Sequence, residues 1–190
     1  MGRMELADLT GRRIAVGVCG GISAYKIVQL VSYLVQSGAQ VEVVLTDSAR
    51  EFVGPASFQG LTGRKVRFDF WDTPQNERAS HIELGLWAEL LVVAPLTAAT
   101  AAKMSTGLAD NLLVATWLAV RCPVAAAPAM NPRMWSHPAV RGSMEKLGEF
   151  GVQFVGPEKG HMSCGEPGEG RMAEPEEIYR VCVQLLGTRV

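Results

Sequence analysis

A single cysteine stands among glycine, proline and charged residues in the segment HMSCGEPGEGRM, at residues 161–172. Cys164 has no CxxC neighbour, and nothing else in the chain suggests a secreted, disulfide-stapled protein, so a zinc ligand and a structural disulfide are both poor explanations. The glycines and Pro167 exclude a regular helix or a central strand and favour a mobile loop or hairpin. The segment is therefore either a surface loop with an incidental thiol or a lid that delivers a proton.

A polar amide lies in apolar surroundings in the segment PAMNPRMW, at residues 128–135. Asn131 sits between a strand end and Pro132, with two methionines and a tryptophan close by in the sequence. A buried amide needs hydrogen-bond partners. Asn131 can cap a helix that has Pro132 as its first residue, or it can bind a ligand carboxylate. The spacing alone favours the cap.

His81 opens another apolar segment, HIELGLWAEL. A lone histidine at a helix start is more often structural than functional. The chain has only two other histidines, His137 and His161, and no pair of them has the spacing of a metal site. We therefore predict no metal centre.

Short β-branched runs alternate with helical segments, which is typical of a parallel sheet covered by helices on both faces. The strands are expected at residues 12–18, 39–46, 89–95, 122–128 and 152–156. Helices are expected within 20–38, from residue 81 onward, near 97–120, at 137–149 and at 174–186. A further helix should begin in DSAREFV, with Asp47 or Ser48 as its cap.

Ligands of such sheets bind beyond the carboxyl ends of the strands. Four loops meet that condition and can line one crevice: CGGIS (19–23), TDS (46–48), APLTAAT (94–100) and APAMNPRMW (127–135). The glycines of the first loop fit a phosphate cradle as well as they fit a tight turn without a ligand. They match neither GxGxxG nor the Walker pattern, so one mononucleotide fits better than NAD. The third loop is either a second wall of that site or a capped helix with a small-residue face.

Composition limits the classes of protein that fit the chain. It has 190 residues, of which 48% are hydrophobic and 19% charged, and its formal net charge is −1. These values suit one globular domain over residues 1–190 and give no electrostatic reason to expect nucleic acid or an anionic membrane as a partner. No apolar run reaches the length of a membrane span, and the first residues lack a signal-peptide core. A cytoplasmic location is expected.

Taken together, these motifs resemble the homo-oligomeric flavin-containing cysteine decarboxylases. The shared features cover nearly the whole chain, in the order that the family has them: GGISAYK, HIEL, APLTAATAAK, GLADNLL, PAMNPRMW and CGEPGEGRMAEP. The resemblance is strongest to the members that act on 4′-phosphopantothenoylcysteine in coenzyme A biosynthesis. In bacteria that activity typically occupies the N-terminal half of a bifunctional protein.

The resemblance implies a flavodoxin-like α/β fold, a three-layer sandwich with a parallel sheet. It also implies a homotrimer, or a dodecamer built from four trimers, with FMN at a subunit interface. Transferred residue by residue, the FMN contacts fall on Gly20, Gly21, Ile22, Ser23, Thr46, Asp47, Ser48, Thr97, Ala98, Ala99, Thr100 and Ala129.

The implied reaction is the FMN-dependent decarboxylation of 4′-phosphopantothenoylcysteine to 4′-phosphopantetheine. The substrate thiol is oxidised to a thioaldehyde, CO₂ leaves, and the resulting enethiol is reduced again. By resemblance His81 is the base, Asn131 and Met134 bind the substrate, and Cys164 is the proton donor. Residues 160–173 correspond to a mobile loop that clamps the substrate.

The chain departs from the family pattern at two positions. Ala99 replaces a usual asparagine, and Cys19 stands where bacterial members often have threonine. We expect weaker FMN retention rather than a new reaction. An oxidative peptidyl-cysteine decarboxylase, a flavin prenyltransferase and a non-catalytic regulatory flavoprotein remain alternatives. Residues 186–190 resemble the opening of the synthetase half of bifunctional members, so they either begin a missing synthetase domain or end a monofunctional chain.

Overall fold

The structure is a computed structural model that describes residues 5–71, 79–160 and 168–187. The strands are β1 (Arg13–Val18), β2 (Gln40–Leu45), β3 (Leu90–Leu96), β4 (Val124–Pro128), β5 (Val152–Phe154), β6 (Glu158–Gly160) and β7 (Gly168–Arg171). The helices are α1 (Ala24–Gln36), the 3-10 helix η1 (Asp47–Glu51), α2 (Pro55–Thr62), α3 (Ser80–Trp87), α4 (Ala98–Thr106), α5 (Leu112–Ala119), α6 (Pro132–Ser136), α7 (Pro138–Glu149) and α8 (Pro175–Leu185).

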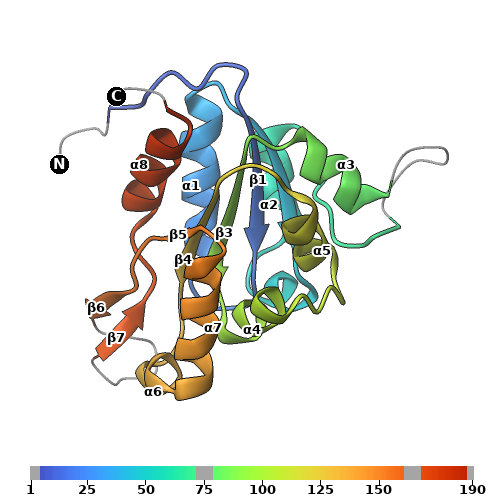
Figure 1. Ribbon diagram of the computed structural model, residues 1–190. Helices are drawn as coiled ribbons and strands as arrows, with labels where there is room; N and C mark the ends of the chain where they lie inside the picture. The colour runs from blue at the N-terminus through green and yellow to red at the C-terminus, as the bar shows by residue number, and fades with distance from the viewer. Residues whose placement is uncertain (1–4, 72–78, 161–167, 188–190) are drawn as a thin grey trace.

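Five parallel strands form the central sheet, in the order β2-β1-β3-β4-β5. One hydrophobic core packs α1, α2 and α8 against one face of the sheet, and a second core packs α3, α4, α5 and α7 against the other. Figure 1 shows these three layers. The flavodoxin-like α/β prediction is therefore confirmed, and the five predicted strands agree with the observed ones to within two residues.

The sequence of the central strand explains its position. β3 reads LLVVAPL and all seven of its residues are buried, as expected for a parallel strand that is covered on both faces. In the neighbouring strand β1, a Cβ atom added to Gly17 would lie 2.2 Å from Leu113 Cδ1. The absence of a side chain at Gly17 therefore lets α5 approach the sheet closely.

The segment predicted as one helix near 97–120 is two helices. α4 ends at Gly107, which has a φ of 74° in the left-handed region. Asn111 then caps α5, because its side chain accepts a hydrogen bond from the Val114 amide at 3.1 Å. A glycine stop followed by an asparagine cap explains the interruption.

The cap predicted after β2 is wrong. η1 begins after Thr46, so Asp47 and Ser48 lie inside its first turn, and Thr46 makes no side-chain cap hydrogen bond. Helix α2 was not predicted, although Pro55 in its first turn and Gly63 at its end, with a φ of 66°, are standard boundary signals.

β6, directly before the segment predicted as a loop or hairpin, and β7, inside that segment, form an antiparallel hairpin. The Met130 amide donates to the Gly170 carbonyl at 2.9 Å, so the base of the hairpin lies against the loop that follows β4. A Cβ on Gly170 would lie 2.2 Å from the Met130 carbonyl oxygen, which explains the glycine. The mobility of the segment stays a prediction.

Among the described residues, each helix is too short or too polar to cross a bilayer.

Candidate functional site

The loops predicted to form the site lie at one edge of the sheet, where β1, β2, β3 and β4 end (Figure 1). Backbone hydrogen bonds connect them in pairs. The Thr46 amide donates to the Val18 carbonyl at 3.0 Å, and the Ala129 amide donates to the Leu96 carbonyl at 3.0 Å. The predicted convergence of these loops is confirmed.

The first glycine loop is packed tightly against the loop that follows β2. A Cβ on Gly20 would lie 2.5 Å from Ser48 Cβ and 2.7 Å from the Ser48 carbonyl carbon, so no side chain fits there. A Cβ on Gly21 would meet Thr97 Cγ2 at 3.9 Å, an ordinary contact distance. Three of the predicted loops therefore meet around these two glycines.

The start of α1 suits an anion. Its N-cap residue, Ser23, makes no side-chain cap hydrogen bond, and the first turn holds no acidic residue. The exposed hydroxyl of Ser48 lies nearby, 3.4 Å from the Thr46 hydroxyl. A helix N-terminus without a side-chain cap, next to glycines and hydroxyl groups, is a common phosphate-binding arrangement. Ile22, which is 58% exposed, adds an apolar surface beside it.

The start of α4 forms the neighbouring wall. The Thr97 side chain caps this helix by accepting a hydrogen bond from the Thr100 amide at 3.3 Å. The two threonine hydroxyls lie 3.2 Å apart. Ala98 is half-buried and Ala99 is exposed, so this turn offers backbone and small side chains to the edge of the sheet.

Cys19 points into the protein beside this wall. It is fully buried, and the Thr100 side chain and the Thr97 backbone lie within hydrogen-bonding reach of its thiol. Burial raises the pKa of Cys19 from 9.0 to about 11, and the two hydrogen bonds offset this only in part. The residue therefore contributes to packing under the loop rather than to its exposed surface.

The Cys19 thiol should make the stability of the protein depend on pH. Between pH 9 and 11 the unfolded chain loses the thiol proton while the folded chain retains it, so this contribution is present below pH 9 and is lost as the pH rises. We expect wild type to lose on the order of 1 kcal/mol relative to Cys19→Ser by pH 10, about 2–4 °C in melting temperature. Melting curves recorded from pH 8 to 10.5 measure this loss of stability. If the melting temperatures of wild type and Cys19→Ser changed equally with pH, the prediction would be contradicted.

Asn131 caps α6, as the sequence predicts. Its Oδ1 accepts a hydrogen bond from the Arg133 amide at 2.8 Å, and Pro132 occupies the first turn. Asn131 is half-buried, and the side chain of Met134 one turn later is 47% exposed. Cys164 lies outside the described residues. Gly168, the first residue of β7, is so close to Pro132 that an added Cβ would lie 2.8 Å from its Cγ.

His81 is not brought to Asn131 within one chain. It lies in the first turn of α3, beside Arg67 and Phe70 of the segment that pairs with β2, whereas Asn131 follows β4. Figure 1 shows α3 well apart from α6 and the hairpin. The buried Nδ1 atom of His81 has no hydrogen-bond partner in the described part of the chain, and the ring packs edge-on against Phe70 at 5.6 Å.

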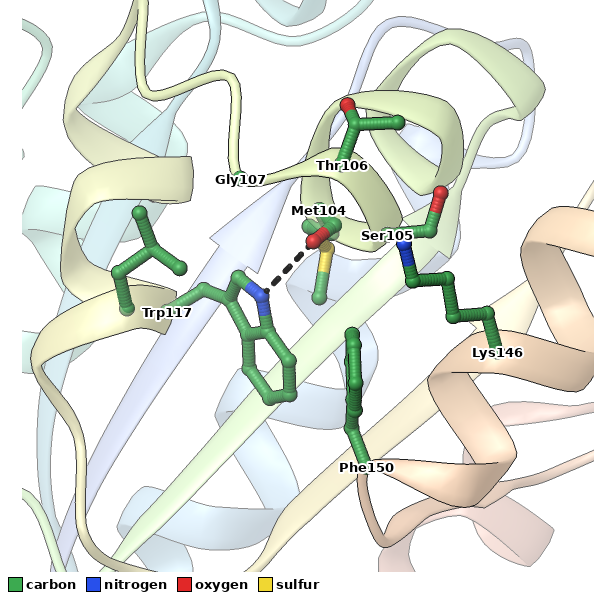
Figure 2. A pocket seen from close by; sticks show the side chains of 8 residues that line it. Met104, Ser105, Thr106, Gly107, Trp117, Lys146 and Phe150 are labelled. Carbon is green, nitrogen blue, oxygen red and sulfur yellow. Dashed lines mark hydrogen bonds between the residues drawn. The ribbon is translucent and has the colours of Figure 1, made fainter.

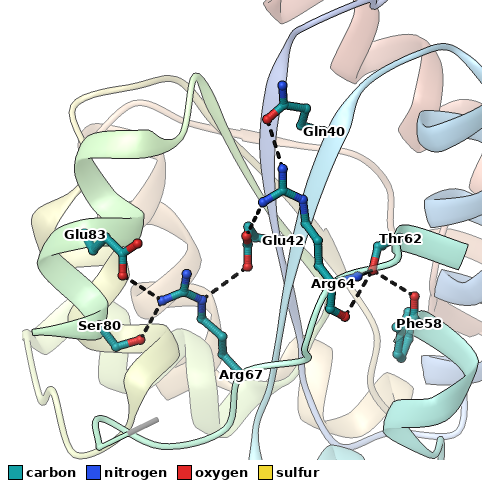
Figure 3. Close-up of polar contacts among 8 residues, drawn as sticks. All are labelled: Gln40, Glu42, Phe58, Thr62, Arg64, Arg67, Ser80 and Glu83. Carbon is teal, nitrogen blue, oxygen red and sulfur yellow. Dashed lines mark hydrogen bonds and ion pairs between the residues drawn. The ribbon is translucent and has the colours of Figure 1, made fainter. Parts of the chain in front are cut away.

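An ion-pair network that was not predicted joins the sheet to α3 (Figure 3). Arg67 Nε lies 3.2 Å from Glu42 Oε2, and Arg67 Nη1 lies 3.1 Å from Glu83 Oε2. Arg64 Nη1 bonds the other Glu42 oxygen at 2.8 Å. The signal in the sequence is Glu42 itself, a single charge inside the apolar strand QVEVVL.

A second such contact joins the glycine-loop helix to the hairpin. Lys26 Nζ lies 2.8 Å from Glu174 Oε2, and Arg171 in β7 also pairs with Glu174. Lys26 and Arg171 both contribute to lowering the pKa of the Glu174 carboxyl, the hydrogen bond from Lys26 most of all. This triad connects α1 with the base of the segment that contains Cys164.

A pocket of about 410 Å³ lies away from the predicted site, between α4, α5 and α7 (Figure 2). Trp117 and Phe150 line it, and the Trp117 indole N–H donates to the Met104 carbonyl at 3.3 Å. None of the predicted site residues lines this pocket. Among the described residues, no cluster of three histidine, cysteine, aspartate or glutamate side chains could hold a metal ion.

Comparisons with known proteins agree with the sequence motifs. A family model described as Flavoprotein matches residues 3–187. The coenzyme A biosynthesis bifunctional protein CoaBC of Bacillus subtilis is 42% identical over 173 residues, which cover 91% of this chain and 43% of that protein. CoaBC of Escherichia coli is 39% identical over 93% of this chain and 43% of its own. The chain thus spans about half the length of these curated relatives.

Several solved structures are similar to this chain over nearly their whole length. A PPC decarboxylase mutant complexed with pantothenoylaminoethenethiol has a TM-score of 0.86 and 32% identity, covering 93% of this chain and 99% of its own. The FMN binding protein AtHal3 has a TM-score of 0.81 and 33% identity, with 91% and 95% covered. The FMN-dependent cysteine decarboxylase SpaF has a TM-score of 0.79 and 34% identity, with 92% and 97% covered.

Proposed function

The chain belongs to the Flavoprotein family, and from this premise we propose that it is an FMN-dependent decarboxylase of 4′-phosphopantothenoylcysteine. The product is 4′-phosphopantetheine, an intermediate of coenzyme A biosynthesis. Support comes from the CoaBC relatives at about 40% identity and from the PPC decarboxylase structure, which this chain matches over almost its full length. The expectation of FMN agrees with the cofactor of AtHal3 and SpaF.

The residues at the sheet edge fit FMN. The start of α1 has no side-chain cap, and the approach of Gly20 to Ser48 forms a narrow, hydroxyl-lined cradle, so these groups would hold the phosphate. The first turn of α4, from Thr97 to Thr100, and Ala129 would line the rest of the cofactor. This convergence of loops is the observation that carries the proposal.

When bound, FMN would supply the acceptance and return of a hydride, which no side chain can provide. Asn131 would hold the substrate carboxylate with its amide, and the exposed side chain of Met134 would pack against the substrate. His81 would accept the thiol proton as the general base. Cys164, outside the described residues, would return a proton to the product from the segment between β6 and β7.

We place the site between two copies of the chain, in a homotrimer or a dodecamer of trimers. His81 lies on α3 beside β2, whereas Asn131 follows β4 and begins α6, which Figure 1 shows well apart from α3, so one chain cannot apply both to the same substrate. A second copy can supply His81, because closed symmetric oligomers bring different surfaces of the same chain together. The buried Nδ1 of His81, without a partner in the described chain, is consistent with a neighbour or ligand that completes its environment.

We further propose that residues 1–190 form one decarboxylase domain that works in the cytoplasm. Two hydrophobic cores enclose one sheet, and both cores draw on residues from the two halves of the chain. The relatives that act in coenzyme A biosynthesis support this location.

The direct test is turnover. Purified protein loaded with FMN should release CO₂ from 4′-phosphopantothenoylcysteine and form 4′-phosphopantetheine, measured by mass spectrometry. A peptide that ends in cysteine serves as the competing substrate. Preferential turnover of the peptide, or flavin binding without CO₂ release from either compound, would contradict the proposal.

A further inference from the structure

We infer that Arg67 positions His81 and thereby sets the rate of the step in which His81 accepts a proton. The inference rests on the proposed role of His81. It concerns a residue that belongs to none of the motifs in the sequence and that lies in the connection between α2 and α3.

The backbone of Arg67 is fixed to the edge of the sheet. Its amide donates to the Val43 carbonyl at 2.9 Å, and its carbonyl accepts from the Leu45 amide at 3.0 Å. The guanidinium is also held, because its Nε donates to Glu42 Oε2 at 3.2 Å. The side chain is only 17% exposed. Arg67 is therefore part of the rigid sheet rather than of a free loop.

From this anchor the guanidinium reaches the first turn of α3 (Figure 3). Its Nη1 donates to Ser80 Oγ and to Glu83 Oε2, each at 3.1 Å. Ser80 directly precedes His81, and Glu83 follows it by two residues. The two hydrogen bonds thus fix the helical turn that carries the imidazole.

Packing buries Ser80, but few other side-chain hydrogen bonds in the described structure fix that turn. The N-cap residue, Ala79, makes no side-chain hydrogen bond, and the close packing of α3 on α5 occurs later, where Gly85 approaches Ala119. The His81 Nδ1 has no hydrogen-bond partner in the described part of the chain. The orientation of the ring therefore depends on the turn itself and on Phe70, which lies three residues after Arg67 in the same segment.

The chemistry of the guanidinium suits this role. Burial acts to lower the pKa of Arg67, but the contacts with Glu83 and Glu42 outweigh it, and the pKa is raised above its usual value. The group is always charged, and its planar fork can serve three acceptors in fixed directions. A lysine at this position could not hold Glu42, Ser80 and Glu83 in the same geometry.

Arg64 offers a matched control. It also pairs with Glu42, through Nη1 and Oε1 at 2.8 Å, but it lies near Trp87 at the far end of α3 rather than near the first turn. In Arg67→Met we expect kcat to fall about tenfold to a hundredfold, with KM and FMN retention changed by less than about threefold. Arg64→Met should leave all three within about threefold. Equal losses in both variants would overturn the inference.

A double-mutant cycle separates positioning from general structural damage. If Arg67 acts through His81, Arg67→Met should lower the residual rate by less than about twofold when His81→Asn is already present. The same fold loss in both backgrounds would overturn the inference.

A measurement without turnover keeps the inference separate from the proposed function. Carbethoxylation of His81 by diethyl pyrocarbonate, mapped by mass spectrometry with exposed His137 as the internal reference, should be severalfold faster in Arg67→Met and in Glu83→Gln than in wild type. Glu83→Gln retains the pair between Arg67 and Glu42 and so protects the fold. Inactive wild type would reject the proposed function alone, whereas unchanged labelling in both variants would reject the positioning role.

Discussion

A His81→Asn variant is expected to lose about 10²- to 10⁴-fold in kcat while it retains FMN, because it lacks the general base that accepts the substrate thiol proton. The fold should tolerate the change. His81 is half-buried, its Nδ1 makes no hydrogen bond within the described chain, and asparagine is smaller than histidine. The measurement is the rate of CO₂ release, with the flavin spectrum recorded anaerobically before and after substrate is added.

His137→Asn is the matched control for this variant. His137 caps α7 through its Nδ1, which accepts from the Ala139 amide at 3.2 Å, and asparagine is also a good cap. Its activity should equal that of wild type. Rapid bleaching of the flavin by substrate in His81→Asn would show that the thiol proton leaves without His81 and would contradict the assignment.

An Asn131→Asp variant is expected to lose at least about a hundredfold in kcat/KM without loss of stability. Aspartate caps a helix as well as asparagine does, so α6 should form normally. The added carboxylate, however, would repel the carboxylate of the substrate, and like charges about 4 Å apart near a protein surface cost on the order of 4 kcal/mol. Steady-state kinetics and a melting curve on the same preparation test both parts.

The Asn131→Ser variant separates the effect of the added charge from the effect of losing the side-chain amide. Serine preserves the cap and adds no charge, so its activity should lie between those of wild type and Asn131→Asp. Full activity in both variants would show that Asn131 acts only as a helix cap, and would contradict its role in binding the substrate carboxylate.

The sheet could be predicted because its strands carry strong local signals. β3 is an unbroken apolar run, β1 and β2 are short valine-rich runs that lead into Gly20 and Thr46, and β4 is a short apolar run that ends at Pro128. The rule that ligands bind at the carboxyl ends of parallel strands then located the loops around Gly20, Thr46 and Thr97 without knowledge of their contacts. The Asn131 cap was equally local, since the asparagine and Pro132 are adjacent.

The remaining features depend on contacts between distant residues. Arg67 meets Glu42 and Glu83 only because the chain returns to the edge of β2 before α3, and no sequence periodicity encodes that return. The separation of His81 from Asn131 follows from the topology, which places the first turn of α3 beside β2 and α6 after β4, with β1 and β3 between these two strands. The role of Cys164 rests on resemblance alone, because the residue lies outside the described structure.

Complementation between two inactive variants tests the account most directly. His81→Asn and Asn131→Asp protein, mixed in equal amounts and refolded together with FMN, should recover about a quarter of the wild-type decarboxylation rate, because a quarter of the sites shared by two chains would pair an intact His81 with an intact Asn131. The double variant refolded with an equal amount of wild type should give the same quarter. No recovery in the first mixture and half the activity in the second would show that each chain builds its own site, and would contradict the account.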